Sequence, residues 1–422
     1  MTLLQFYLSK IKSMLWVRPV LLSGAAIFWI IFASLADKRF PEKWTIQIEK
    51  ETLVDLFTIL ATTMLTVATF SVSAVASAFA SVASSASPRA TRIVMSDTGV
   101  QSTLASFLAA FIYALVSITA LSGFSFGRSG RFVLFVGFVA IVAWVLMSFL
   151  RWVDRVSRLG KLGDTLDRVS LAARETLSNP QMVGPLGGRP LSESNHEQSA
   201  GLAWFPEKFG YIQYINMEEL QKLAEELKTE IVLQVRPGSL VTKNIPIGKL
   251  YGGTKPDDEV WRKLQRCLAI DNNRNETTDP RFAMILMAEV ADRALSPAVN
   301  DPGTAIEVLS IQTELFHIWA TNDLDRKVGQ ADFDRIFAPC IAAEDLVFDA
   351  FHPIARDGSA MVEVGMRLQK ALWSIMHLDH EDLRQAADGF RQTALEYFEH
   401  GLLIESQRQR VRELARRELS RD

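Results

Sequence analysis

Eight hydroxyl side chains recur at helical spacing in an uncharged stretch of the chain between Asp55 and Arg89. Their successive separations are 4, 4, 3, 4, 4, 4 and 3 residues, a mean of about 3.7, which puts them on one face of one α-helix. These residues are Thr58, Thr62, Thr66, Thr69, Ser73, Ser77, Ser81 and Ser84. At about 1.5 Å per residue the row is about 40 Å long, enough to cross a bilayer. It predicts either the lining of a pore or a closely packed helix interface.

Both interpretations of this row stay open at the level of sequence. Small and hydroxyl residues at intervals of four let helix backbones approach closely, and a hydroxyl can donate to the carbonyl four residues earlier. A pore would need several copies of the chain around an axis, because one subunit is too small to enclose water. Arg89 and Arg92 would then form a cationic ring at the cytoplasmic mouth that favours anions. Alternatively, the two arginines only mark the cytoplasmic side of the membrane.

A second group of polar residues surrounds a turn in the C-terminal half. Asp279-Pro280 and Asp301-Pro302 each predict a helix start, with aspartate as the N-cap and proline in the first turn. Free amides at such a start, together with an arginine, would form a small anion site. The candidate residues are Arg281, Arg293, Ser296, Asn300, Asp301 and Thr304. The alternative is a capped helical corner without a ligand, and Asp292 and Asp301 would oppose an anion.

No other pattern predicts catalysis. The sequence has no phosphate-binding glycine loop, dinucleotide-binding fingerprint, zinc-protease motif or serine-hydrolase elbow. Cys267 and Cys340 are not spaced as metal ligands, and His377, Asp379 and His380 lack a further ligand at a suitable distance. We therefore expect no enzymatic activity, no metal and no cofactor. Basic residues are interleaved with acids and the net charge is −3, so we expect no nucleic acid partner.

Four long apolar segments must position the hydroxyl row. They cover about 19–36, 53–86, 101–122 and 132–150, and each can span a hydrocarbon core of about 30 Å. Their cores contain no Asp, Glu, Lys, Arg or His, which argues against an ion-coupled transporter. The flanking basic residues favour both termini in the cytoplasm.

The rest of the chain has the composition of a soluble protein. A heptad-like run predicts a connecting helix that could self-associate. Its members are Leu159, Leu162, Leu166, Val169 and Ala173. Residues 179–200 are rich in turn formers and predict a linker. Residues 211–215 and 230–235 predict strands on either side of a helix at 217–228. Residues 331–418 predict helix throughout.

These segments predict an α-helical membrane protein with four transmembrane helices and a cytoplasmic α+β, mostly helical C-terminal region. We expect a four-helix transmembrane domain at 1–150 and an amphipathic connecting helix and linker at 151–200. A small α/β module at 201–255 and a helical cytoplasmic domain at 256–422 would follow.

Three motifs resemble one known family. They are Ser87-Pro88-Arg89, Arg236-Pro237-Gly238-Ser239-Leu240-Val241 and, above all, Arg293-Ala294-Leu295-Ser296-Pro297-Ala298-Val299-Asn300-Asp301-Pro302-x-Thr304-Ala305. Together they resemble the bacterial predicted membrane proteins grouped as domain of unknown function 2254. The resemblance implies a multi-span inner-membrane protein with a cytoplasmic C-terminal region, and it implies no reaction.

The favoured functional interpretation is an oligomeric passive ion channel or pore in the bacterial inner (cell) membrane, multi-pass, with both termini cytoplasmic. Its partners would be the lipid bilayer, further copies of the chain as a homo-oligomer, and inorganic ions. The alternative is a non-conducting membrane-anchored sensor or scaffold whose cytoplasmic domain binds a ligand or partner.

Overall fold

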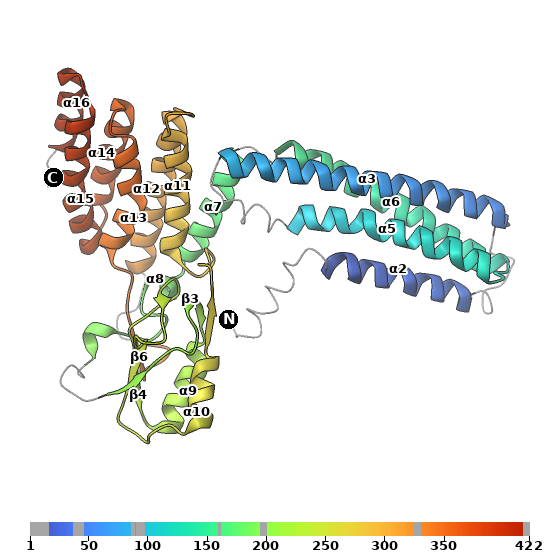
Figure 1. Ribbon diagram of the computed structural model, residues 1–422, viewed down its shortest axis with the longest axis horizontal. Helices are drawn as coiled ribbons and strands as arrows, with labels where there is room; N and C mark the ends of the chain where they lie inside the picture. The colour runs from blue at the N-terminus through green and yellow to red at the C-terminus, as the bar shows by residue number, and fades with distance from the viewer. Residues whose placement is uncertain are drawn as a thin grey trace. The chain divides into compact units, whose positions relative to one another are not determined.

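A computed structural model describes residues 17–36, 46–85, 89, 98–158, 162–194, 201–324 and 331–416. The chain forms two compact units (Figure 1). The N-terminal unit contains Leu3–Ser84 together with Thr91–Asp164, and the C-terminal unit contains Ser85–Ala90 together with Thr165–Asp422.

Long apolar helices lie side by side in the N-terminal unit (Figure 1). They are α2 (Val17–Ala36), α3 (Lys50–Ser85), α5 (Thr98–Gly123) and α6 (Arg128–Arg158). Three of them contain segments long and apolar enough to cross a membrane, namely Lys50–Ser81, Ser102–Gly123 and Arg128–Val156. These segments coincide with the spans expected at 53–86, 101–122 and 132–150. The segment expected at 19–36 forms α2, whose apolar part, Ser23–Leu35, is shorter, so a fourth crossing stays a prediction.

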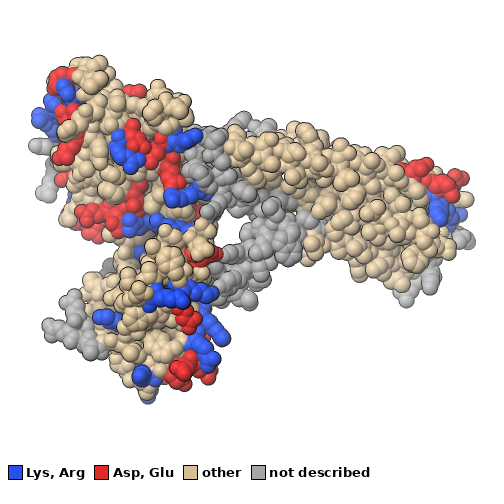
Figure 2. Space-filling model, viewed as in Figure 1, with Lys and Arg blue, Asp and Glu red and all other residues tan. Residues whose placement is uncertain are grey.

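Aromatic side chains fill the centre of the N-terminal unit. The Phe57 ring of α3 lies 5.5 Å from the Tyr113 ring and 5.5 Å from the Phe138 ring, edge-on to both. The Tyr113 hydroxyl donates to the carbonyl oxygen of Leu134 at 3.1 Å. This packing anchors one face of α3 against α5 and α6. The visible face of the unit is uncharged along its length, with charged residues gathered at one end (Figure 2).

The C-terminal unit contains two small sheets. Their strands are β1 (Arg189–Pro190), β2 (Leu202–Trp204), β3 (Gly210–Ile215), β4 (Glu230–Leu233), β5 (Leu240–Val241), β6 (Gly248–Tyr251), β7 (Leu268–Asp271) and β8 (Ile336–Ala338). One sheet has the order β1-β8-β4-β6-β2, and the other has the order β5-β3-β7. β8 is parallel to both β1 and β4, whereas the remaining pairs are antiparallel. The strands expected at 211–215 and 230–235 correspond to β3 and β4.

Helices make up the rest of the C-terminal unit. They are α7 (Leu162–Leu177, from Thr165 onward), α8 (Pro180–Val183), η2 (Leu191–Glu193), α9 (Met217–Leu227), α10 (Asp258–Arg266), α11 (Pro280–Leu295), α12 (Pro302–Leu324), α13 (Ala343–Asp357), α14 (Val362–Met376), α15 (Glu381–Gly401) and α16 (Glu405–Ala415). α11 packs against α12 and α13, and α14 packs against α12, α15 and α16. Two helix starts expected from Asp-Pro pairs are confirmed, since α11 begins at Pro280 and α12 begins at Pro302.

Three expectations about this unit need correction. The segment 179–200 is not a plain linker, because its described part forms α8, β1 and η2. Helix throughout 331–418 is wrong at β8, which completes the larger sheet. The heptad-like run does not present a free seam, because Leu166, Val169 and Ala173 are buried by the chain itself. Leu159 lies outside the described residues.

Candidate functional site

The predicted hydroxyl row lies on the outward face of α3. The residues from Thr58 to Ser81 in this row are all exposed, and Ser84 belongs to the last turn of α3, where only the backbone is described. The opposite face is buried in the aromatic core through Leu53, Phe57, Leu60 and Met64. The separation of the two faces follows from the spacing of the residues, since both sets recur every three or four positions.

The threonine hydroxyls of this row donate within their own helix. Thr58 Oγ1 donates to the Val54 carbonyl oxygen at 2.7 Å, Thr66 Oγ1 to that of Thr62 at 2.9 Å, and Thr69 Oγ1 to that of Leu65 at 2.8 Å. Thr62 Oγ1 makes the same bond to the Thr58 carbonyl oxygen. Each hydroxyl oxygen keeps acceptor capacity on its outward side. The face can therefore contact water, a cation or a neighbouring backbone without leaving its donors unpaired.

Two arginines, Arg89 and Arg92, follow the row in the sequence, and the structure describes only the first. Arg89 forms an ion pair with Glu289 of α11, within the C-terminal unit. This pairing offsets the positive charge that a cationic ring would need at Arg89. Arg92 lies outside the described residues.

The turn between α11 and α12 is held by its own hydrogen bonds. Ser296 Oγ donates to the Arg293 carbonyl oxygen at 2.7 Å, and the Asn300 amide donates to the Ser296 carbonyl oxygen at 2.8 Å. Asn300 has a φ of 52°, in the left-handed region that asparagine tolerates better than most residues. These hydrogen bonds and the left-handed Asn300 hold the turn inside the Arg293–Ala305 motif.

The start of α12 is capped by Asp301. Its carboxylate accepts from the Thr304 amide at 3.2 Å and from the Thr304 hydroxyl at 2.6 Å. The hydroxyl bond, followed by the backbone bonds, lowers the pKa of Asp301. A carboxylate already occupies the position where an anion would use free amides, so the cap satisfies this helix start by itself.

Arg281 does not join the other candidates at this turn. It lies twelve residues before Arg293 on α11, about 18 Å along the helix axis. There, Arg281 Nη1 binds Asp345 Oδ2 at 2.6 Å and Arg281 Nε binds Asp349 Oδ2 at 2.6 Å. The structure brings together Arg293, Ser296, Asn300, Asp301 and Thr304 and assigns Arg281 to a cluster with α13.

Two polar residues with perturbed environments were not predicted. Burial, followed by the neighbouring Asp357, raises the pKa of Asp292 on α11 to about 7, although Arg356 Nη2 lies 3.7 Å from its Oδ2 atom. The sequence gives no signal of this environment, because Arg356 and Asp357 come from α13 and only Glu289 lies on the same helix. Arg236 belongs to a motif that predicted only a turn. Its guanidinium donates to the carbonyl oxygens of Pro339 and Met182, and burial lowers its pKa to about 10.

The two cysteines and the candidate metal ligands have different surroundings in the described segments. These segments contain no cluster of three or more His, Cys, Asp or Glu side chains able to hold a metal ion. Cys267 is buried in the core of the small sheets and Cys340 is exposed. Burial raises the pKa of Cys267 to about 12, which makes this thiol inert while the unit is folded.

Comparison with known proteins supports the membrane assignment. Uncharacterized proteins of Mycobacterium bovis and Mycobacterium tuberculosis are each 36% identical to this chain over 104 residues, or 24% of this chain. The match spans about a fifth of the length of these relatives. No solved structure matches the chain. The family described as "Predicted membrane protein (DUF2254)" matches residues 12–374. The chain therefore belongs to the DUF2254 family of predicted membrane proteins.

Proposed function

We propose that the protein is a passive, non-enzymatic ion pore built from several copies of the chain, with the hydroxyl face of α3 lining the conduit. One observation carries this proposal. α3 buries Leu53, Phe57, Leu60 and Met64 in its own unit and exposes the hydroxyl row from Thr58 to Ser81, which runs between exposed apolar residues of the same helix such as Ile59, Leu65 and Phe70. The hydroxyl oxygens keep free acceptor sites that water can fill and lipid tails cannot, so the copies would place the row toward a shared, water-filled axis.

The hydrogen bonds of the row favour cations over anions in such a conduit. Because the threonine donors bind backbone carbonyl oxygens, the outward atoms act as acceptors. Acceptor oxygens suit water molecules and small cations. The earlier preference for anions rested on Arg89 and Arg92, and Arg89 is paired with Glu289.

A second candidate function follows from the same hydrogen bonds. Back-bonded threonines need no water, so the face could pack dry against another copy and build a non-conducting scaffold. The C-terminal unit would then bind a ligand or partner. The two candidates differ in whether water reaches Thr66 and Thr69.

We assign the protein to the bacterial inner membrane, with α2 as a fourth crossing and both termini in the cytoplasm. This orientation rests on basic residues at the ends of the apolar segments. On the cytoplasmic side these residues would be Lys10, Lys12, Arg18, Arg89, Arg92, Arg151, Arg155, Arg158 and Lys161.

Cysteine labelling tests whether water reaches the row. Single cysteines replace Thr62, Thr66, Thr69 and Ser73 in a background without Cys267 and Cys340, and a charged, water-soluble thiol reagent is added to the protein in liposomes. We expect fast labelling at these positions. The matched control is Thr63→Cys, because Thr63 makes the same bond to the Ile59 carbonyl oxygen but lines an apolar groove against α6. Equal protection of all five positions would exclude the pore.

Particle size separates the pore from a monomeric anchor. In mild detergent the pore proposal requires a stable assembly of several copies, whereas a monomer would contradict it. Changing Thr66 or Ser73 to leucine should reduce ion flux into liposomes and leave the assembly intact. Loss of assembly in these variants would instead favour the scaffold.

A further inference from the structure

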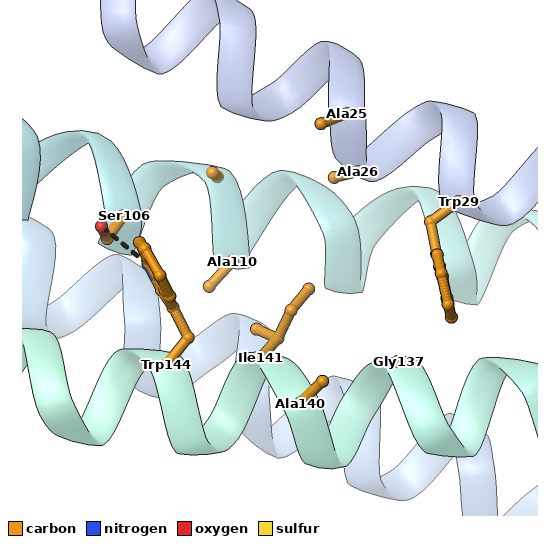
Figure 3. Close-up of a pocket in the computed structure, with 10 residues that line it drawn as sticks. Ala25, Ala26, Trp29, Ser106, Ala110, Gly137, Ala140, Ile141 and Trp144 are labelled. Atoms are coloured by element: carbon orange, nitrogen blue, oxygen red, sulfur yellow. Dashed lines mark hydrogen bonds between the residues drawn. The ribbon is translucent and has the colours of Figure 1, made fainter.

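Two adjoining hollows lie among α2, α5 and α6 of the N-terminal unit, and α3 lines neither. The larger has a volume of about 360 Å³ and is mostly apolar (Figure 3). Its walls are made largely by small residues: Ala25, Ala26, Ala109, Ala110, Gly137 and Ala140. Small side chains leave a groove between these packed helices. Its apolar walls suit a hydrocarbon chain.

The smaller hollow, of about 240 Å³, is polar. It is lined by hydroxyls and charged groups from α5 and α6: Ser102, Thr103, Ser148, Arg151, Asp154 and Arg155. Ser106 and Trp144 border both hollows, and Trp144 Nε1 donates to Ser106 Oγ at 3.0 Å (Figure 3). The two hollows therefore meet at this pair and form one site with a polar and an apolar part.

The polar part lies at the end of a membrane-spanning segment. Arg151 and Arg155 belong to the last turns of the apolar segment Arg128–Val156. Ala140 of the groove lies eleven residues before Arg151, about 16 Å along the axis of α6. The charged hollow thus has the depth of lipid headgroups, and the groove extends from it toward the hydrocarbon core.

The charge of the polar hollow favours an anion. Two arginines face one aspartate, which leaves a net charge of +1. The guanidinium of Arg155 also occupies the space in which a Cβ atom on Gly99 would stand, in the first turn of α5. The start of α5 adds the partial positive charge of a helix N-terminus. A phosphate group can accept hydrogen bonds from both guanidinium groups and from the serine hydroxyls.

We propose that this two-part hollow binds one anionic phospholipid, with its phosphate at Arg151 and Arg155 and one acyl chain in the groove between α2, α5 and α6. The polar hollow explains the headgroup, and the groove explains why the ligand is a lipid rather than a soluble anion. Basic pockets between membrane helices are a common means of recognising such headgroups. The site is independent of the proposed pore, because α3 contributes to neither hollow.

Native mass spectrometry of the purified, delipidated full chain tests both parts of the site. Three probes are compared: dioleoylphosphatidylglycerol, dioleoylglycerol with the same chains and no phosphate, and inorganic phosphate. We expect one phosphatidylglycerol molecule per chain, at least tenfold weaker binding of dioleoylglycerol, and no displacement of the lipid by phosphate. Displacement by phosphate would identify a soluble-anion site and overturn the proposal, as would equal binding of the two lipids.

Matched variants assign the binding to these residues. The double variant Arg151→Gln/Arg155→Gln should weaken phosphatidylglycerol binding at least tenfold, whereas Arg131→Gln, at the other end of α6, should not. Ala140→Leu fills the groove and should also weaken binding, whereas Ala143→Leu, on an exposed face of α6 outside the groove, should not. Unchanged binding in either test variant would refute the site. A second outcome would also refute the site. If Ala140→Leu binds lipid fully but changes the oligomer mass, the groove is a contact between copies of the chain.

Discussion

The ionisation of Asp292 should make the stability of the C-terminal unit depend on pH. The carboxylate lies on α11 and faces Glu289, Asp357 and Arg356, and its Oδ1 atom is buried without a hydrogen-bond partner among the described residues. Burial and the neighbouring acids raise its pKa from 3.8 to about 7. The folded unit therefore keeps a proton on Asp292 in a pH range in which the unfolded chain has released it.

The direction and size of the effect follow from this difference. The stability contributed by neutral Asp292 is fully present below pH 3.8 and is lost as the pH rises to about 7. A difference of about three pKa units corresponds to a free energy of unfolding on the order of 4 kcal/mol. Asp292→Asn keeps the side chain neutral at all pH values. We expect the variant to match the wild type at pH 4 and to be more stable by roughly that amount at pH 8.

The buried thiol of Cys267 provides the assay. In a Cys340→Ser background, a dipyridyl disulfide, which reacts with thiols at acid pH, reaches Cys267 only when the C-terminal unit opens. Comparing the two proteins at the same pH cancels the pH dependence of the thiol reaction itself. The labelling rate of the wild type divided by that of Asp292→Asn should rise from near 1 at pH 4 to about 1,000 at pH 8. Asp388→Asn, which changes an exposed aspartate paired with Arg391, is the matched control. A ratio that stays constant from pH 4 to pH 8 for Asp292→Asn would show that Asp292 does not keep its proton in the folded unit.

Three further substitutions in the C-terminal unit have predictable effects in the same labelling assay. Arg236→Met should lower the free energy of unfolding by about 3 kcal/mol, because it leaves the carbonyl oxygens of Pro339 and Met182 without their donor. The control Arg410→Met changes an exposed arginine and should have little effect. Gly238→Ala should lower the free energy of unfolding by about 2 kcal/mol, because Gly238 has a φ of 93° and a Cβ atom there would overlap the Asp279 carboxylate. Equal stability of this variant and the wild type would contradict the prediction. Leu166→Ala should lower the free energy of unfolding by about 3 kcal/mol and leave the particle size unchanged, whereas a change in particle size would show that this helix pairs between copies.

Features written into short stretches of sequence were predictable. The row on α3 needed only helical spacing, and the starts of α11 and α12 needed only an Asp-Pro pair. The family motif around Asn300 was also visible in the sequence, and it corresponds to a locally bonded turn. In each of these cases the determining interactions lie within a few residues of one another.

Features that depend on distant residues were not predictable from one sequence. β8 has three residues, and Pro339 directly after it marks the end of a helix but not a strand; its pairing with β4, more than a hundred residues earlier, arises only in the fold. Asp292 acquires its environment from Arg356 and Asp357 only when α11 packs on α13. The hollow between α5 and α6 likewise joins Ser102 with Arg151 through tertiary packing. Side chains such as these carry no periodicity that sequence analysis could detect.

The most direct test of the pore is the conductance of a Thr66→Cys variant in a planar bilayer. Thr66 is exposed on the hydroxyl face near the middle of the apolar segment Lys50–Ser81. We expect a measurable conductance that falls when a bulky, charged thiol reagent is added, and no such fall for Thr63→Cys. A protein that assembles and inserts but conducts nothing, or a conductance that the reagent leaves unchanged at Thr66→Cys, would contradict it.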